Sequence, residues 1–393
     1  MIKLSEVELE PQLDEGRESK PRKEMKTLYY LAVLSSCLSL NVGSSIRQVR
    51  QTTDSNGKPC TCVHYSRCPN VPTDGSGIIQ LKFGGVSSPC QTSLEICCAN
   101  PSREQENVPS KPPTRADCGK RNTGGLVVRI IGAGANDAQF AEFPWMVAIL
   151  VEVKVANEFT KLYECGGSLI HEKVVMTAAH CIAQKSRDSI IMRAGEWDTH
   201  NLKEPFPHQD RRVAQVIVHE NFDKDNLYND IALLIADQPF VFNDNVQTTC
   251  LPRPDDFFLD NNCWASGWGQ DAFDDKEGRY QMVQKKVSLP MVRRERCQAE
   301  LREAGNLGPD FVLDDSFVCA GGIKNRDTCK GDGGSPLVCP IKGKPSHYQQ
   351  VGIVSWGIRC GLETPAAYVN VAKFRPWIDR HLSRLNFQPQ YVY

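Results

Sequence analysis

The pattern of apolar and polar positions along the chain predicts many short β-strands and one helix. Short apolar runs separated by Gly, Pro and Asn breaks are typical of strands in barrels and sandwiches. Such runs occur at 145–150, 168–170, 173–177, 231–235 and 351–355. Only the C-terminal segment after Lys373 looks helical, with Phe374, Trp377, Ile378 and Leu382 on one face. The pattern therefore predicts an all-β fold that ends in a helix.

A further apolar run, residues 28–40, has the features of a secretory signal. It follows Met25-Lys26, precedes small residues at 43–45, and is shorter than the roughly 20 apolar residues of a spanning helix. We therefore predict a signal peptide over 25–44, with a membrane anchor as the alternative. Residues 1–24 mix acidic and basic side chains, so we interpret them as an extension from an upstream start codon.

Length and charge narrow the classes of function. The chain has 393 residues, which predicts one large domain and a smaller one. A net charge of -1 means that the chain has no excess of positive charge with which to attract a polyanion. Nucleic acid and membrane surfaces are therefore poor candidate partners. Of the 17 cysteines, Cys37 lies in the leader, and the even number that remains predicts disulfides and an oxidising compartment.

Six of these cysteines cluster within residues 60–98, after a polar lead-in over 45–59. A unit of about 40 residues cannot be held by apolar burial alone, so we predict three disulfides, each contributing on the order of 2 to 4 kcal/mol. Zinc is the alternative, but the adjacent pair Cys97-Cys98 and the secretory leader disfavour it. Spacing alone leaves about 15 pairings open.

The segment 99–129 is interpreted as a linker that proteases can reach. Residues 99–117 are rich in Pro, Ser and charge and have almost no apolar side chains. Two bonds in the linker follow a basic residue, Arg103-Glu104 and Arg129-Ile130, and either suits a trypsin-like enzyme.

Three motifs beyond the linker carry candidate chemistry. The first is Thr-Ala-Ala-His-Cys with His180, and the second is Asn-Asp-Ile-Ala-Leu-Leu with Asp230. The third, over 327–336, reads Asp-Thr-Cys-Lys-Gly-Asp-Gly-Gly-Ser-Pro. These motifs resemble those of chymotrypsin-like serine proteases, whose third motif contains Gly-Asp-Ser-Gly-Gly-Pro. The resemblance runs from Arg129 to the C-terminus and implies two six-stranded β-barrels over 130–393.

The same resemblance implies His180 as base and Asp230 as the carboxylate that orients it. Gly333 stands where the family has its nucleophilic serine, and glycine has no side chain that could attack a carbonyl. Ser335 lies two residues further on, where the family has glycine, so it does not replace the nucleophile. One sequencing error would not explain both changes. We therefore predict a protease homologue that does not hydrolyse peptides.

The resemblance also assigns a specificity pocket and an activation pocket. Asp327 matches the acid on the floor of a trypsin-like pocket, and Gly357 and Ala366 match its walls. Ala366 replaces a family glycine, so its methyl group predicts a partly filled slot. Asp327 either binds a basic side chain or is paired internally or solvated, and these alternatives stay open. Asp332 matches the acid that receives the new N-terminal ammonium after a cut at Arg129.

We expect no required cofactor. Glu196 and Asp198 lie in a loop that binds calcium in some relatives, and carboxylate oxygens suit that ion. The spacing of the later acids Glu204 and Asp210 fits the site poorly. Calcium at Glu196 is therefore kept only as a candidate.

The Cys-x-Cys start and Cys-Cys end of the first cluster resemble a clip domain, a module found ahead of serine protease domains in arthropod haemolymph. The two resemblances imply these disulfides: Cys60–Cys97, Cys62–Cys90, Cys68–Cys98, Cys118–Cys250, Cys165–Cys181, Cys263–Cys339, Cys297–Cys319 and Cys329–Cys360. The clip resemblance favours Arg103 over Arg129 as the regulatory cut. After a cut at Arg129, the disulfide of Cys118 would keep the clip segment attached.

The whole arrangement resembles the prophenoloxidase-activating factors of the serine protease homologue class. The resemblance implies a secreted haemolymph protein that is cut by an upstream clip-domain serine protease. The cut protein would assemble with prophenoloxidase or phenoloxidase, with a homo-oligomer as one expected form, and would promote melanisation in innate immunity. Fold alone does not establish function. Two alternatives stay open: an active trypsin-like protease that uses Ser335, and an adhesion or microbial pattern-recognition protein.

Overall fold

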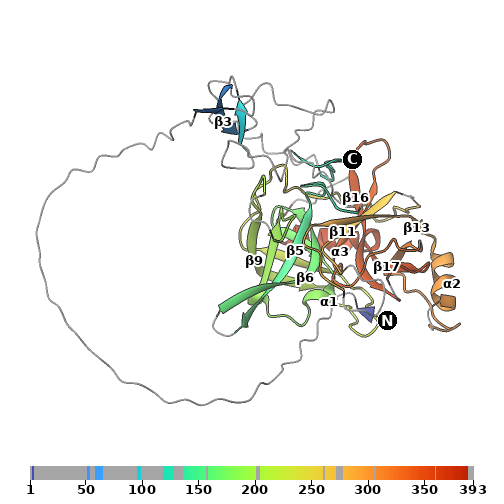
Figure 1. The fold of residues 1–393 in the computed structure, drawn as a ribbon. Helices are drawn as coiled ribbons and strands as arrows, with labels where there is room; N and C mark the ends of the chain where they lie inside the picture. Colours follow the sequence, from blue (N-terminus) through green and yellow to red (C-terminus); the bar gives the residue numbers. More distant parts are fainter. Residues whose placement is uncertain are drawn as a thin grey trace, which may run out of the picture.

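The computed structural model describes twelve stretches of the chain. These are residues 2–3, 51–53, 58–64, 95–98, 118–126, 136–155, 158–200, 204–259, 262–270, 278–304, 307–358 and 360–387. Figure 1 shows two sheets of the protease-like domain lying side by side, with most of the green strands in one and the orange and red strands in the other. The predicted all-β class and the double-barrel architecture are confirmed.

Six antiparallel strands close into the first barrel, in the order β10-β7-β6-β5-β8-β9. Their bounds are β5 Met146–Val155, β6 Glu158–His171, β7 Val174–Thr177, β8 Ile190–Ala194, β9 Gln209–Val218 and β10 Ala232–Ala236. Successive side chains of a strand point to opposite faces, and alternate residues such as Val147 and Ile149 fill the barrel interior. The strands predicted at 145–150, 168–170, 173–177 and 231–235 are therefore confirmed.

The second sheet follows the order β12-β11-β15-β16-β17-β14-β13. Its bounds are β11 Cys263–Gly267, β12 Lys285–Leu289, β13 Met291–Val292, β14 Phe317–Gly321, β15 Pro336–Pro340, β16 Tyr348–Gly357 and β17 Pro365–Asn370. Only Pro290 separates β12 from β13, so one bent strand pairs with β11 at one end and with β14 at the other. The sheet thereby closes into a second barrel. The two-residue strand β1, Ile2–Lys3, pairs with the end of β16.

Helices are few in the described residues, and only the C-terminal one was predicted. The predicted C-terminal helix is α3, Val371–Arg384, and its four apolar residues are all buried. The expectation that no other segment is convincingly helical is wrong, because α2 spans Arg294–Ala304. Only Cys297 and Leu301 of α2 are fully buried, so its sequence has too narrow an apolar face to show helical periodicity. No described helix has the length and apolar character needed to cross a membrane.

The N-terminal region contains a small antiparallel sheet of order β2-β3-β4. The strands are β2 Gln51–Thr53, β3 Pro59–His64 and β4 Glu95–Cys98. Cys60 and Cys98 are both disulfide-bonded. Two of the three pairings implied for this region involve Cys68 or Cys90, which lie outside the described stretches, and the side chain of Cys97 is not described, so all three stay predictions.

Candidate functional site

The histidine and aspartate motifs meet between the two barrels. His180 lies in the short helix α1, Ala179–Ile182, which follows β7. Asp230 lies two residues before β10, the last strand of the first barrel along the chain. The His180 Nδ1 atom lies 2.6 Å from Asp230 Oδ2, and the His180 backbone N–H donates to Asp230 Oδ1 at 2.8 Å. Ser355 Oγ of β16 donates a third hydrogen bond to the Asp230 carboxylate at 2.7 Å. A fully buried carboxylate with these partners fixes the orientation of an imidazole.

The turn before Asp230 is strained in a way that positions this carboxylate. Leu227 and Asn229 both have positive φ values, 57° and 55°. A left-handed conformation at a residue other than glycine costs roughly 1 to 2 kcal/mol. The chain therefore retains the backbone conformation that places Asp230 beside His180.

The loop that would carry the nucleophile is also in place, without a nucleophile. Gly333 is buried, and its carbonyl accepts a hydrogen bond from the Gly166 N–H of β6 at 2.9 Å. Ser335 is fully buried, and its hydroxyl has no hydrogen-bond partner among the residues that the structure describes. A Cβ on Gly166 would lie 2.0 Å from this hydroxyl oxygen, so the Ser335 side chain packs on the Gly166 backbone. No hydrogen bond connects Ser335 to His180, so the imidazole does not activate this hydroxyl.

The Asp332 carboxylate is held by backbone donors. Its Oδ1 accepts from the Gly269 N–H and its Oδ2 from the Cys329 N–H, both at 2.9 Å. A Cβ on Gly269 or Gly267 would approach the carboxylate to within 2.6 Å, so these glycines allow its close packing. Burial raises the pKa of Asp332 to about 6, although both N–H donors act in the opposite direction. This is the residue that the sequence assigned to the activation pocket, and its role there stays a prediction.

The predicted specificity pocket brings Asp327, Gly357 and Ala366 into one region. Asp327 Oδ1 accepts the Thr328 N–H at 2.9 Å and Oδ2 accepts the Gly361 N–H at 3.2 Å. A Cβ built on Gly357 would lie 3.6 Å from the Ala366 Cβ, which is van der Waals contact. Because β16 and β17 pair at this point, the Ala366 methyl group lies beside Gly357 on the neighbouring strand, and a partly filled slot stays a prediction. Burial, with a smaller contribution from Asp332, raises the pKa of Asp327 to about 7.

This shift predicts that Asp327 makes the fold less stable as pH rises. A carboxyl group with a raised pKa binds its proton more tightly in the folded chain than in the unfolded chain. Asp327 therefore does not reduce the free energy of unfolding below the unfolded pKa of about 4, and it reduces this free energy progressively as the pH rises to about 7. We expect Asp327→Asn to match the wild type near about pH 4 and to exceed its free energy of unfolding by up to about 4 kcal/mol near about pH 8, since each pKa unit corresponds to about 1.4 kcal/mol. Urea denaturation at both pH values measures the difference. The exposed Asp255→Asn serves as control, and an Asp327→Asn difference that is the same at both pH values would refute the shift.

The candidate calcium residue Glu196 contacts an arginine and a histidine. Its carboxylate is 3.2 Å from Arg193 and 3.3 Å from the His208 ring. Ligand atoms of Glu196, Glu204 and His208 lie within 4.8 Å of one another. Burial raises the pKa of Glu204 to about 8. The Asp198 backbone N–H donates to Glu204 Oε1 at 2.7 Å, but its carboxylate is not part of this group and accepts the His200 N–H at 3.1 Å.

The structure joins the same five cysteine pairs that the resemblance implied for the protease-like domain. The bridge from Cys165 to Cys181 ties α1 to β6 beside Gly166, so it links the histidine to the loop of Gly333. Both predicted cleavage sites, Arg103-Glu104 and Arg129-Ile130, fall outside the described residues. Sequence reasoning did not identify Arg193 or His208, because no motif marks an ion pair between distant positions.

Comparison with known proteins agrees with this geometry. Residues 133–378 match the family model Trypsin, and residues 49–99 match the model Serine protease Clip domain PPAF-2. The chain is 50% identical to phenoloxidase-activating factor 2 of Galleria mellonella over 72% of its own length and 94% of the relative. It is 34% identical to the inactive CLIP domain-containing serine protease A28 of Anopheles gambiae, over 91% and 96% of the two chains. Phenoloxidase-activating factor 3 of Holotrichia diomphalia is 29% identical over 88% and 99%.

Proposed function

This chain belongs to the trypsin family of serine proteases and carries a clip domain, and we propose that it acts as a secreted, non-catalytic cofactor of prophenoloxidase activation. The observation that carries the proposal is Gly333 beside an ordered His180–Asp230 pair, because the site has a base and no side chain to attack. Removing the serine of such a triad costs roughly a millionfold in turnover. The protein would therefore act by binding other proteins.

The names of the relatives support the direction of this proposal. Two of them are called phenoloxidase-activating factors, and others are called inactive CLIP domain-containing serine proteases. In our proposal an upstream clip-domain protease cuts the linker after Arg103, and the cut protein assembles with prophenoloxidase or phenoloxidase in the haemolymph. In this proposal, cleavage of the linker switches on the binding of partner proteins, and the protein itself performs no catalysis.

The test combines purified protein, intact or cut, with prophenoloxidase and its activating protease. We expect the cut protein to raise oxidase activity and to enter a larger complex, measured by light scattering after gel filtration. Arg103→Gln should prevent this effect, and the matched Arg129→Gln should not. His180→Ala should leave the effect unchanged, because no hydrolysis is required.

Two results would reject the proposal. Loss of the cofactor effect in His180→Ala would point to catalysis. Binding of the cut protein to microbial glycans, with no effect on oxidase activity, would favour a recognition protein.

A further inference from the structure

A single arginine bridges the two ends of the loop between β8 and β9. Arg193 lies near the end of β8, and its Nε and Nη2 atoms donate to the two oxygens of Asp210 in β9, at 2.7 and 3.0 Å. Its Nη1 atom donates to Glu196 Oε2 at 3.2 Å. The side chains are 18% exposed for Arg193 and 2% for Glu196. One guanidinium thus connects two carboxylates across the loop that resembles a calcium site.

The remaining groups of this loop fit calcium poorly. Calcium takes roughly 6 to 8 oxygen ligands. Glu196 Oε1 accepts the Trp197 N–H, and Glu204 Oε1 accepts the N–H groups of Trp197 and Asp198. In the described part of the loop, Glu204 Oε2 is the buried carboxylate oxygen without a partner, and the neighbouring His208 offers a nitrogen atom. The described side chains of this loop therefore offer too few uncommitted carboxylate oxygens to bind this ion by themselves.

We propose that the Arg193 guanidinium is the resident cation of this loop and that the fold does not depend on calcium. Arginine is always charged, and its planar fork matches carboxylate oxygens in the two-point geometry seen with Asp210. It places positive charge between Glu196 and Asp210, where a divalent ion would otherwise have to neutralise both. Because the arginine is part of the chain, the loop needs no ion from solution. Its two ends stay connected as long as the ion pairs of Arg193 persist.

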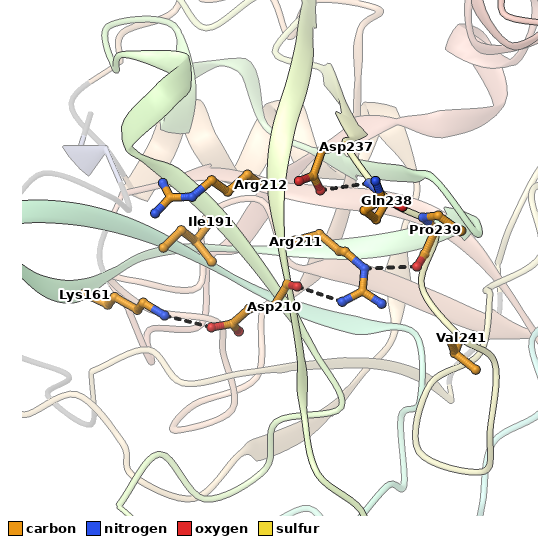
Figure 2. Close-up of a pocket in the computed structure, with 9 residues that line it drawn as sticks. All are labelled: Lys161, Ile191, Asp210, Arg211, Arg212, Asp237, Gln238, Pro239 and Val241. Carbon is orange, nitrogen blue, oxygen red and sulfur yellow. Dashed lines mark hydrogen bonds and ion pairs between the residues drawn. The ribbon is translucent and has the colours of Figure 1, made fainter. Parts of the chain in front are cut away.

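The same network shapes a surface groove outside the catalytic region. Asp210 also pairs with Lys161 of β6 at 2.9 Å, as Figure 2 shows. The groove has a volume of about 650 Å³ and runs along β9, between Lys161 and the loop of Pro239 and Val241. Arg211 closes the other side by donating to the Pro239 carbonyl at 2.9 Å. Ion pairs that are partly exposed weaken with salt, so this groove should respond to ionic strength and not to calcium.

Calcium titration of the full chain tests the inference without reference to phenoloxidase. We expect isothermal titration calorimetry to detect no calcium binding to the wild type. The melting temperature should change by less than about 1 °C between EGTA and millimolar calcium, because a ligand that does not bind the folded state cannot stabilise it. A single calcium site, or a rise of several degrees, would overturn the proposal.

Three variants make the test specific to Arg193. Arg193→Gln should lower the melting temperature in EGTA by about 5 °C, and calcium should restore at least half of this loss, because Glu196 then loses its arginine partner and Asp210 keeps only Lys161. Arg193→Lys keeps the charge and should show a smaller loss without a calcium response. The matched control Arg212→Gln removes an exposed pair with Glu152 in the same groove and should change neither quantity.

A folded Arg193→Gln protein that ignores calcium would show that the guanidinium does not stand in for an ion. If Arg193→Gln does not fold, the Arg193→Lys protein decides the question. A calcium response in that variant would contradict the proposal, and its absence would support it.

Discussion

The double variant Gly333→Ser, Ser335→Gly is expected to give this protein a reactive serine. The exchange rewrites the loop as Gly-Asp-Ser-Gly-Gly-Pro, and the backbone already suits it. Gly334 has a φ of 78° and requires glycine, whereas Gly333 is not among the described residues with positive φ. The new hydroxyl would meet an imidazole that Asp230 already orients at 2.6 Å.

We expect an organophosphate to label the double variant, and turnover of an activated ester to rise at least about a thousandfold over the wild type. The expected gain is smaller than the roughly millionfold cost of losing a triad serine, because the methyl group of Ala366 is predicted to fill part of the specificity slot. Mass spectrometry and ester assays measure the two effects. Adding His180→Ala should abolish both, and Ser335→Gly alone should remain inert. If the double variant folds but is not labelled, the missing serine hydroxyl is not the sole reason why this site is inactive.

The barrels could be predicted from sequence because their strands are short apolar runs with turn residues at both ends. The apolar run at 145–150 predicted the first part of β5. It did not predict the extension of β5 to Val155 or the start of its partner β6 at Glu158. These residues alternate charged and apolar side chains on a hairpin that reaches past β8, so no continuous apolar run marks them. The helix α2 was missed for the related reason that only two of its side chains are fully buried.

The candidate site also contains residues that the sequence identified and residues that it did not. His180, Asp230 and Gly333 lie in motifs of several residues, so the sequence identified each of them and their order. Arg193 was missed because its partners are set by how β8 and β9 pair, which spacing does not reveal. Glu196 was noticed as an oxygen donor, but its arginine partner decides what it can bind. Long-range ion pairs are thus the part of this site that needs coordinates.

Arg121 provides the clearest case of such a pair, and its removal is expected to destabilise the domain strongly. Its side chain is 5% exposed, and its Nη2 atom donates to the buried Glu142 carboxylate at 2.5 Å. The guanidinium also lies 4.0 Å from the ring centroid of Trp264 and 4.7 Å from that of Phe143. These contacts anchor the segment 118–126, which also carries the disulfide from Cys118 to Cys250.

We expect Arg121→Ala to lower the free energy of unfolding by about 3 kcal/mol, because it leaves a buried carboxylate with one partner fewer and empties an aromatic cage. This loss of stability should lie near the lower end of the range for broken buried ion pairs, since Lys286 still contacts Glu142 at 2.7 Å. Urea denaturation with intact disulfides measures it. Arg187→Ala removes an exposed pair with Asp188 and should cost less than about 0.5 kcal/mol. Equal effects of the two substitutions would show that Arg121 is not an anchor of this segment.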